Sequence, residues 1–253
     1  MVQKREGRIK WLNRMVSEPY YFLHFIAFFS YLPIRSSASP YVSDRLLDRE
    51  IQAFLALMML SAVKMVREET WEAFIADILF YAKIFLIAVS LITDYRLALW
   101  YSVAFSVIYL LALQPAFDKL GTAKKLTPLQ LEELLSEGNT TTCWLIEFYA
   151  STSSAFVRSS RCFPELSITY SNDILSFGIV DLGLFPNVAA KFGISLAGGM
   201  SQLPTYILFE KGTEVSRFPD FYVEATPSLP ITKKLLCQHF ELDRLLLDYV
   251  KGS

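Results

Sequence analysis

The chain has 253 residues, of which 53% are hydrophobic and 19% are charged, and its net charge at pH 7 is −1. This length has room for one domain of ordinary size and an additional segment. The near-zero charge and the lack of a dense Lys/Arg run in the sequence give no reason to expect a nucleic-acid partner.

The hydrophobic excess lies before residue 115, where apolar stretches follow a basic N-terminal segment, residues 1–18. Four stretches fall within residues 19–114, namely 19–34, 51–66, 74–92 and 97–113. Each has about 16 to 19 residues, which is at the short end for a membrane-spanning helix. We therefore expect an all-α membrane region in contact with membrane lipid, with the alternative that one or two helices lie in the membrane interface. Asp77 and Lys83, inside the third stretch, should face other helices or water.

The first stretch has a second interpretation, because a basic head followed by an apolar core is also the order of a cleavable signal peptide. Its last residues, L-P-I-R at 32–35, lack a small-x-small cleavage pattern. We therefore favour an uncleaved span.

The orientation follows from the Lys and Arg residues in the loops. If all four stretches span the membrane, ten of these residues lie on one side and four on the other. The positive-inside rule then places both termini, and with them residues 115–253, in the cytosol. With three spans, residues 115–253 would be lumenal instead. A glycosylation sequon at Asn139 offers a check, because a glycan there would require the lumenal side.

After Gln114-Pro115 the composition becomes that of a globular domain. Thr127, Pro128 and Gln130 form a capping box that predicts a helix over 129–137. The further expected elements are a strand Cys143–Tyr149, a helix 152–170, a strand 174–181, a helix 185–192, strands 205–209 and Thr213–Phe218 joined by a turn at Lys211-Gly212, and a helix 231–250 with a break near Glu241. Alternating strands and helices imply a parallel core sheet, and the final hairpin makes that sheet mixed. The predicted fold class is therefore α/β, a central mixed sheet flanked by helices.

The most informative segment is 144–156, W-L-I-E-F-Y-A-S-T-S-S-A-F, in which an apolar strand runs into hydroxyl residues that can cap a helix. It resembles the strand and redox loop of the thioredoxin superfamily, and E-F-Y-A is similar to the lead-in of protein disulfide isomerases. In those enzymes a Cys-x-x-Cys pair follows at once. Here the sequence is Ser153-Ser154-Ala155-Phe156, so the two cysteine positions hold Ser153 and Phe156.

Further segments carry the same resemblance in the same order. Glu147 stands where the superfamily has a buried acid beneath the active site. G-I-V-D at 178–181 matches the end of the second strand, K-F-G-I at 191–194 matches the approach to the substrate loop, and Leu203-Pro204 matches the cis-proline turn. The resemblance implies a thioredoxin-like domain over 115–253 and a groove in which backbone before the proline pairs with an extended peptide. The implied groove residues are Thr152, Ser153, Ser154, Leu203 and Pro204.

The membrane region resembles that of the type 2 thioredoxin-related transmembrane proteins. The similar segments are E-P-Y-Y at 18–21, A-L-M-M-L-S-A-V-K-M-V at 56–66 and D-Y-R-L-A-L-W-Y at 94–101. The resemblance covers essentially the whole chain and implies a multi-pass protein of the endoplasmic-reticulum membrane with a link to protein folding or redox homeostasis. The typical motif of that family is already reduced to S-x-x-C, and here its cysteine position is Phe156.

Thiol–disulfide exchange needs a thiolate and a second thiol nearby, and neither Ser153 nor Phe156 supplies one. The three cysteines of the chain, Cys143, Cys162 and Cys237, have no Cys-x-x-Cys spacing. We therefore expect no catalytic residues and no enzyme activity. With two histidines far apart in the sequence, we expect neither a metal site nor a cofactor.

The buried acid also lacks its usual neighbour. The lysine that partners it in disulfide isomerases would fall at Ile179. Glu147 is then neutral in an apolar setting, partly hydrated, or paired with another residue.

These patterns favour a membrane-anchored, redox-inactive thioredoxin-like protein that binds peptide or protein partners. An alternative is an oxidoreductase or redox sensor that uses one of the three non-motif cysteines. A third interpretation is a scaffold that assembles with partners through its membrane helices, with Asp77 and Lys83 as interhelical contacts.

Overall fold

The computed structural model describes residues 18–37, 40–117, 119–136, 143–196, 203–219 and 231–252. The chain divides into two compact units, Met1–Pro115 and Ala116–Ser253. The predicted glycosylation sequon at Asn139 lies outside the described residues.

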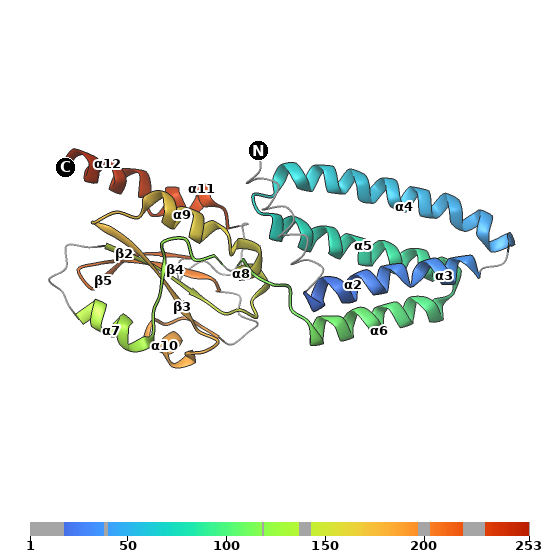
Figure 1. Cartoon of the computed structure of the whole chain (residues 1–253), viewed down its shortest axis with the longest axis horizontal. Helices are drawn as coiled ribbons and strands as arrows, with labels where there is room; N and C mark the ends of the chain where they lie inside the picture. The colour runs from blue at the N-terminus through green and yellow to red at the C-terminus, as the bar shows by residue number, and fades with distance from the viewer. Residues whose placement is uncertain are drawn as a thin grey trace, which may run out of the picture. The chain divides into compact units, whose positions relative to one another are not determined.

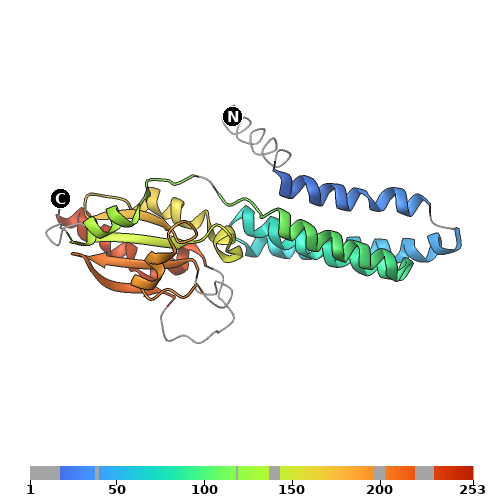
Figure 2. The same cartoon turned by 90° about the horizontal axis from the view of Figure 1, so that it is seen from below.

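The first unit is entirely helical. Its helices are α2 (Pro19–Phe29), α3 (Tyr31–Ser36), α4 (Pro40–Arg67), α5 (Trp71–Thr93) and α6 (Tyr95–Leu111). Figures 1 and 2 both show α4, α5 and α6 running alongside one another. Thr70 accepts a hydrogen bond from the Ala73 amide at the start of α5, and Asp94 accepts one from the Arg96 amide at the start of α6. Side-chain caps therefore define where these two apolar helices begin.

The predicted apolar stretches are helical, but their boundaries differ. Ser30 separates α2 from α3, so the first stretch is not one continuous helix. Within the described residues, α5 is the single helix long and apolar enough to cross a membrane, and α6 is a shorter apolar helix. Many large apolar side chains of this unit are exposed, among them Met59, Trp100 and Leu110.

Polar side chains inside the first unit contact other helices. Asp77 on α5 lies 2.6 Å from Lys64 Nζ on α4. Lys83 Nζ lies 6.0 Å and 5.8 Å from the ring centroids of Tyr20 and Phe105. The prediction that Asp77 and Lys83 face other helices or water is therefore confirmed.

The second unit contains a five-stranded sheet in the order β1-β3-β2-β4-β5. Its strands are β1 (Lys124–Lys125), β2 (Cys143–Tyr149), β3 (Leu175–Asp181), β4 (Thr205–Glu210) and β5 (Thr213–Phe218). Strand β3 pairs in parallel with β1 and β2, whereas β4 pairs antiparallel with β2 and β5. The predicted mixed sheet is confirmed, and β1 is a strand that the sequence did not predict.

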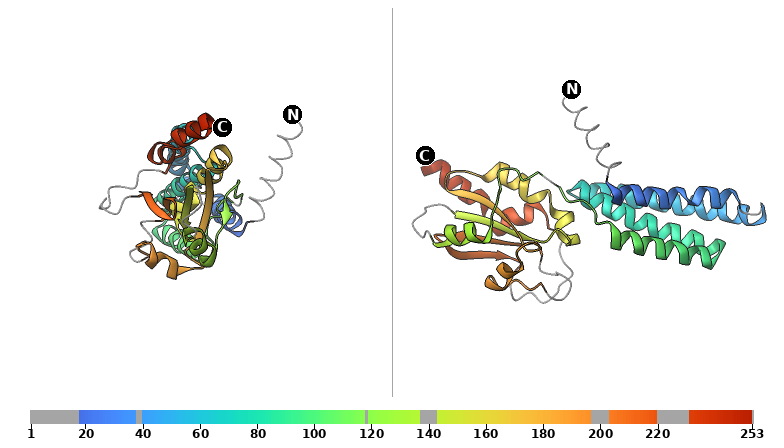
Figure 3. Two further views of the ribbon diagram at one scale, coloured as in Figure 1. Left: turned by 90° about the vertical axis from the view of Figure 1, so that its left-hand side faces the viewer. Right: turned by 60° about the horizontal axis from the view of Figure 1, so that its bottom comes forward.

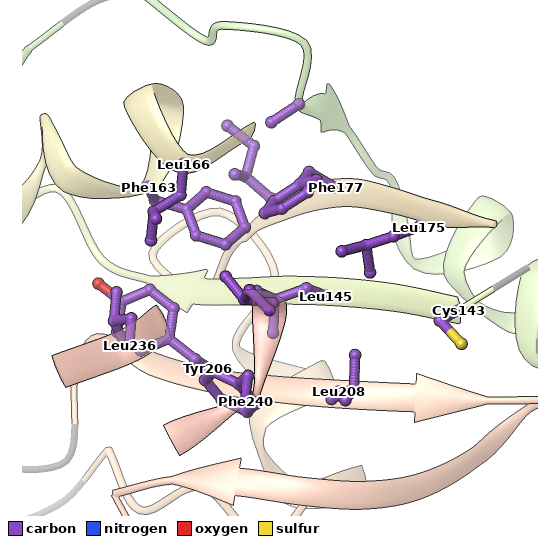
Figure 4. Close-up of a cluster of buried hydrophobic side chains, with 13 residues drawn as sticks. Cys143, Leu145, Phe163, Leu166, Leu175, Phe177, Tyr206, Leu208, Leu236 and Phe240 are labelled. Atoms are coloured by element: carbon purple, nitrogen blue, oxygen red, sulfur yellow. The ribbon is translucent and has the colours of Figure 1, made fainter. Parts of the chain in front are cut away.

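Helices cover both faces of this sheet, as Figure 3 shows. They are α7 (Pro128–Ser136), α8 (Ser154–Ser159), α9 (Cys162–Tyr170), α10 (Pro186–Lys191), α11 (Lys233–His239) and α12 (Leu242–Gly252). One buried cluster joins the strands to α9, α11 and the start of α12, and a second joins them to α7 and α10. Figure 4 shows Phe163 and Leu236 of the first cluster converging on Leu145 and Tyr206. This arrangement confirms the thioredoxin-like fold.

The predicted single helix over 152–170 is wrong, because the structure has α8 and α9 with a break between them. Pro164 has no backbone N–H to bond the Ser160 carbonyl, and such a proline kinks or breaks a helix. A proline is tolerated in the first turn of a new helix, and Pro164 occupies the first turn of α9. The predicted break near Glu241 is confirmed, with Glu241 at a φ of 49°.

Candidate functional site

The strand-to-helix corner after β2 holds the first motif position. Ser153 is buried and is the N-cap of α8, where its Oγ accepts a hydrogen bond from the Phe156 amide at 3.4 Å. The same Oγ donates to the Leu203 carbonyl at 3.3 Å. The fold thus brings together residues 50 positions apart, and it fixes the serine hydroxyl between a helix start and the turn at Leu203-Pro204.

Phe156, at the second motif position, is part of the protein interior. It is 8% exposed, and its ring stacks on Tyr149 with a centroid distance of 4.2 Å and an interplanar angle of 22°. An aromatic pair in this geometry stabilises the corner by packing. A side chain without a heteroatom cannot attack or resolve a disulfide.

The remaining predicted groove residues divide by exposure. Thr152 and Ser154 are exposed at the corner, whereas Leu203 and Pro204 are buried, and the bond between them is cis. The Leu203 carbonyl accepts one hydrogen bond from Ser153, and a carbonyl oxygen has two lone pairs.

Glu147 lies in β2, directly opposite Ile179 on β3 and Tyr206 on β4. It is 2% exposed, and neither its Oε1 nor the Tyr206 hydroxyl has a hydrogen-bond partner among the described residues. Burial raises the pKa of Glu147 to about 8, and a smaller effect of the neighbouring Tyr206 hydroxyl acts in the opposite direction. Of the three states that the sequence left open, the structure supports a neutral carboxyl in an apolar setting at pH 7.

The three cysteines lie apart from the corner in the fold. Cys143 begins β2, about 20 Å along the strand from its end at Tyr149, and Figure 4 shows its sulfur at the end of β2 away from the Tyr206 hydroxyl. Burial raises the pKa of Cys143. Cys162 is 1% exposed and directs its sulfur to the Ile231 carbonyl. Cys237 is half-buried beside Tyr170 and Asp243. None of the three cysteines forms a disulfide.

Neither histidine offers a base for Ser153. His239 Nε2 lies 2.8 Å from the Arg217 carbonyl and 3.2 Å from Ser216 Oγ, on strand β5. His24 is buried inside the helical unit, where its Nδ1 lies 2.7 Å from the Tyr20 carbonyl. Over the part of the chain that the structure describes, no three His, Cys, Asp or Glu side chains gather as metal ligands would.

A pocket of about 300 Å³ beside Glu147 was not predicted. Its lining includes Lys125, which is the register neighbour of Ile179. A two-residue strand carries no periodicity signal, so the sequence alone did not place Lys125 in the same cross-strand row as Glu147.

No protein-family model matches the chain. A thioredoxin-related transmembrane protein 2 of Xenopus tropicalis is 31% identical over 252 residues, which cover 92% of this chain and 85% of the relative. A thioredoxin-related transmembrane protein 2 homolog of Drosophila melanogaster is 27% identical over 225 residues, and the match covers 83% of this chain and 82% of the relative. Among solved structures, a thioredoxin of Nicotiana alata covers 49% of this chain and 94% of its own, at 16% identity and a TM-score of 0.37.

The matches to the curated relatives extend over both the helical unit and the sheet unit. At 31% identity over most of both chains, common descent with the Xenopus protein accounts for the shared sequence. The chain is a membrane protein with a thioredoxin-like domain, and it belongs to the thioredoxin-related transmembrane protein 2 family.

Proposed function

We propose that this membrane-anchored protein is redox-inactive and that its thioredoxin-like domain binds an extended segment of a protein partner next to the corner at Ser153. One observation carries the proposal: the corner and the cis-proline turn are joined through Ser153 and Leu203, while Ser153 and Phe156 occupy the two cysteine positions of the motif. The retained contact between the corner and the cis-proline turn supports peptide binding, and the absence of sulfur at the two motif positions supports redox inactivity.

The chemistry of the thiols supports inactivity. Exchange through the corner would need two sulfur atoms there, and the cysteines instead lie at the start of β2, in α9 and in α11. Two of the three are buried. A buried, protonated thiol is a poor nucleophile.

The proposal for binding rests on the exposed rim of the corner. Thr152 and Ser154 present side chains to solvent on either side of the fixed Ser153. The Leu203 carbonyl keeps a second lone pair for a peptide N–H. An extended peptide can add to such a backbone edge by main-chain hydrogen bonds, with the exposed side chains contributing selectivity.

For the cellular setting, we propose a multi-pass protein of the endoplasmic-reticulum membrane, with the domain in the cytosol and a role in protein folding or redox homeostasis. The excess of Lys/Arg on one side of the four apolar stretches supports this orientation. The ion pair between α4 and α5 supports helices that associate within the membrane.

Inactivity is tested with the full chain in lipid nanodiscs. We expect reduction of insulin by dithiothreitol to proceed at the same rate with the protein as with empty nanodiscs. The triple variant Cys143→Ser, Cys162→Ser, Cys237→Ser is the matched control. Faster reduction by the natural chain than by the triple variant would overturn the proposal.

Binding is tested with a photoreactive residue introduced at Ser154 of the full chain in cells. We expect protein adducts that disappear when the neighbouring Thr152 is replaced by arginine. Ile168 on α9, which is 66% exposed, provides the control position for the photoreactive residue. Adducts that are identical from both positions, or that persist in Thr152→Arg, would count against a site at the corner.

The alternative of a redox sensor is favoured by one observation, the partial exposure of Cys237. Its sulfur, however, lies 3.4 Å from Asp243 Oδ2 and 3.1 Å from the Tyr170 hydroxyl. The thiol donates a hydrogen bond to that carboxylate, and it would have to give up this contact to react as a sensor. Mass spectrometry after mild peroxide treatment distinguishes the two: selective sulfenic acid at Cys237 supports the sensor.

A further inference from the structure

The pocket beside Glu147 lies on the sheet face that α8 and α9 cover. Its walls combine apolar and aromatic side chains, among them Phe117, Phe156 and Ile179, with a few polar and charged ones. At about 300 Å³ it is at the lower end of volumes that hold small molecules in proteins. Every described residue of the lining belongs to the second unit.

The sheet register determines where the charged side chains stand. Lys125, Ile179 and Glu147 are consecutive partners across β1, β3 and β2, so they share one face. Adjacent strands are about 4.8 Å apart, which separates the Lys125 and Glu147 backbones by about 10 Å. Ile179 lies between them, at the position where disulfide isomerases have the lysine that partners the buried acid. The pocket therefore has the Glu147 carboxyl on one side and the Lys125 ammonium toward the other.

The two ends differ in burial. Glu147 is 2% exposed and its Oε1 is without a hydrogen-bond partner among the described residues, although it lines the pocket. Lys119 and Lys125 also line the pocket, and both are exposed to solvent. Among the described lining residues, the charged ones are these two lysines and Glu147, and no second carboxylate is present. A buried unsatisfied polar atom is costly unless a ligand or water completes it.

We propose that this pocket binds a small amphipathic anion, with its negative group at Lys119 and Lys125, its apolar body between Phe117 and Phe156, and a hydrogen-bond acceptor at the Glu147 carboxyl. The rise in the pKa of Glu147 to about 8 supports the inner contact, because a protonated carboxyl donates a hydrogen bond at pH 7. An amine as the ligand would instead require the carboxylate form.

The test uses the full chain in nanodiscs of zwitterionic lipid and a series of matched benzene derivatives, measured by saturation-transfer difference NMR. The main probe is para-acetylbenzoate, which has a carboxylate at one end and a ketone acceptor at the other. We expect saturable binding above that to empty nanodiscs. The neutral para-acetylbenzamide should bind about tenfold more weakly, and para-isopropylbenzoate, which lacks the acceptor, about fivefold more weakly.

Two adjacent lysines supply matched protein controls. Lys125 lines the pocket, whereas Lys124 points to the other face, where its Nζ lies 5.7 Å from the Trp144 ring centroid. Lys125→Glu should weaken para-acetylbenzoate binding by about tenfold, and Lys124→Glu should change it by less than about twofold. Both lysines are exposed, so neither change threatens folding.

Three results would overturn the proposal: no saturable binding above empty nanodiscs, equal effects of Lys124→Glu and Lys125→Glu, or tighter binding of the cationic para-acetylbenzylamine. The last result would mean that Glu147 binds as a carboxylate and selects cations. As a further check within the pocket, Ile179→Lys introduces an ammonium beside Glu147 and removes apolar wall, and it should abolish binding of all the probes.

Discussion

At the scale of single residues, Glu147 is the feature of the domain that most needs explanation. The Glu147 carboxyl is 2% exposed, with Ile179 and Tyr206 as its cross-strand neighbours. It has lost the solvation of its charged form and has no ion-pair partner among the residues that the structure describes. Burial disfavours the ionised form of Glu147, so its carboxyl stays protonated to a higher pH in the folded domain than in the unfolded chain.

This difference predicts a pH-dependent stability. Between about pH 4.5 and about pH 8 the unfolded chain loses the Glu147 proton while the folded domain keeps it, so stability falls as the pH rises through this range. Glu147→Gln removes that dependence, and the variant should gain stability over the natural chain as the pH rises, by about 5 kcal/mol at most. Amide hydrogen exchange of β2 and β3 in the full chain measures it. Equal protection of the two proteins at pH 5 and pH 8.5 would contradict the assignment.

The corner at Ser153 and Phe156 gives a second prediction. The fold keeps the strand-to-helix geometry, so Ser153→Cys with Phe156→Cys should form a disulfide and accelerate insulin reduction. Loss of the Phe156 ring should destabilise the domain by about 3 kcal/mol. The matched control is Ser154→Cys with Phe156→Cys, in which the spacing is wrong. If neither pair forms a disulfide, the corner does not retain the geometry of an exchange site.

At the scale of elements, the association of α4 with α5 depends on Lys64. Its Nζ lies 2.6 Å from Asp77 Oδ2 on α5 and 3.2 Å from Glu68 Oε1 on its own helix. The Asp77 side chain is 11% exposed, so it cannot exchange this contact for water. Removing one partner of such a pair leaves the other charge uncompensated.

We predict that Asp77→Leu lowers the stability of the helical unit by about 3 kcal/mol, because Lys64 then lacks its interhelical partner. The double variant Lys64→Leu, Asp77→Leu should recover much of this loss, and Glu68→Gln, which removes the weaker partner, should have a smaller effect. Thermal unfolding of the full chain in detergent measures all three. A double variant no more stable than Asp77→Leu would exclude the pair as the cause.

The elements also show what the sequence could and could not predict. The bounds of β2 follow from its apolar run, and those of β5 follow from the turn at Lys211-Gly212. Thr127 with Gln130 forms the predicted capping box. The sequence analysis missed the break between α8 and α9 because the serines and Arg161 before Pro164 are compatible with a helix. Only Pro164 itself signals that a new helix begins there. The pocket at Glu147 depends on which residues become neighbours across β1, β3 and β2, and register is a tertiary property that local pattern does not contain.

At the scale of the whole molecule, the number of spans decides on which side of the membrane the domain lies. Within the described residues α5 alone has the length and apolarity of a span, and α6 is shorter. An even number of crossings keeps the domain on the side of the basic N-terminal segment, and an odd number moves it across. The excess of Lys/Arg in that segment favours the cytosol for the N-terminus.

We therefore predict that Asn139 carries no glycan in cells, and that protease added to sealed microsomes removes the domain. Endoglycosidase H treatment and immunoblotting measure both. Insertion of an apolar span of about 20 residues after Pro115 provides the control. It adds one crossing and should bring glycosylation of Asn139, which shows that the sequon can be used. A glycan on Asn139 of the natural chain, with the domain protected from protease, would require an odd number of spans and place the binding corner among lumenal partners instead of cytosolic ones.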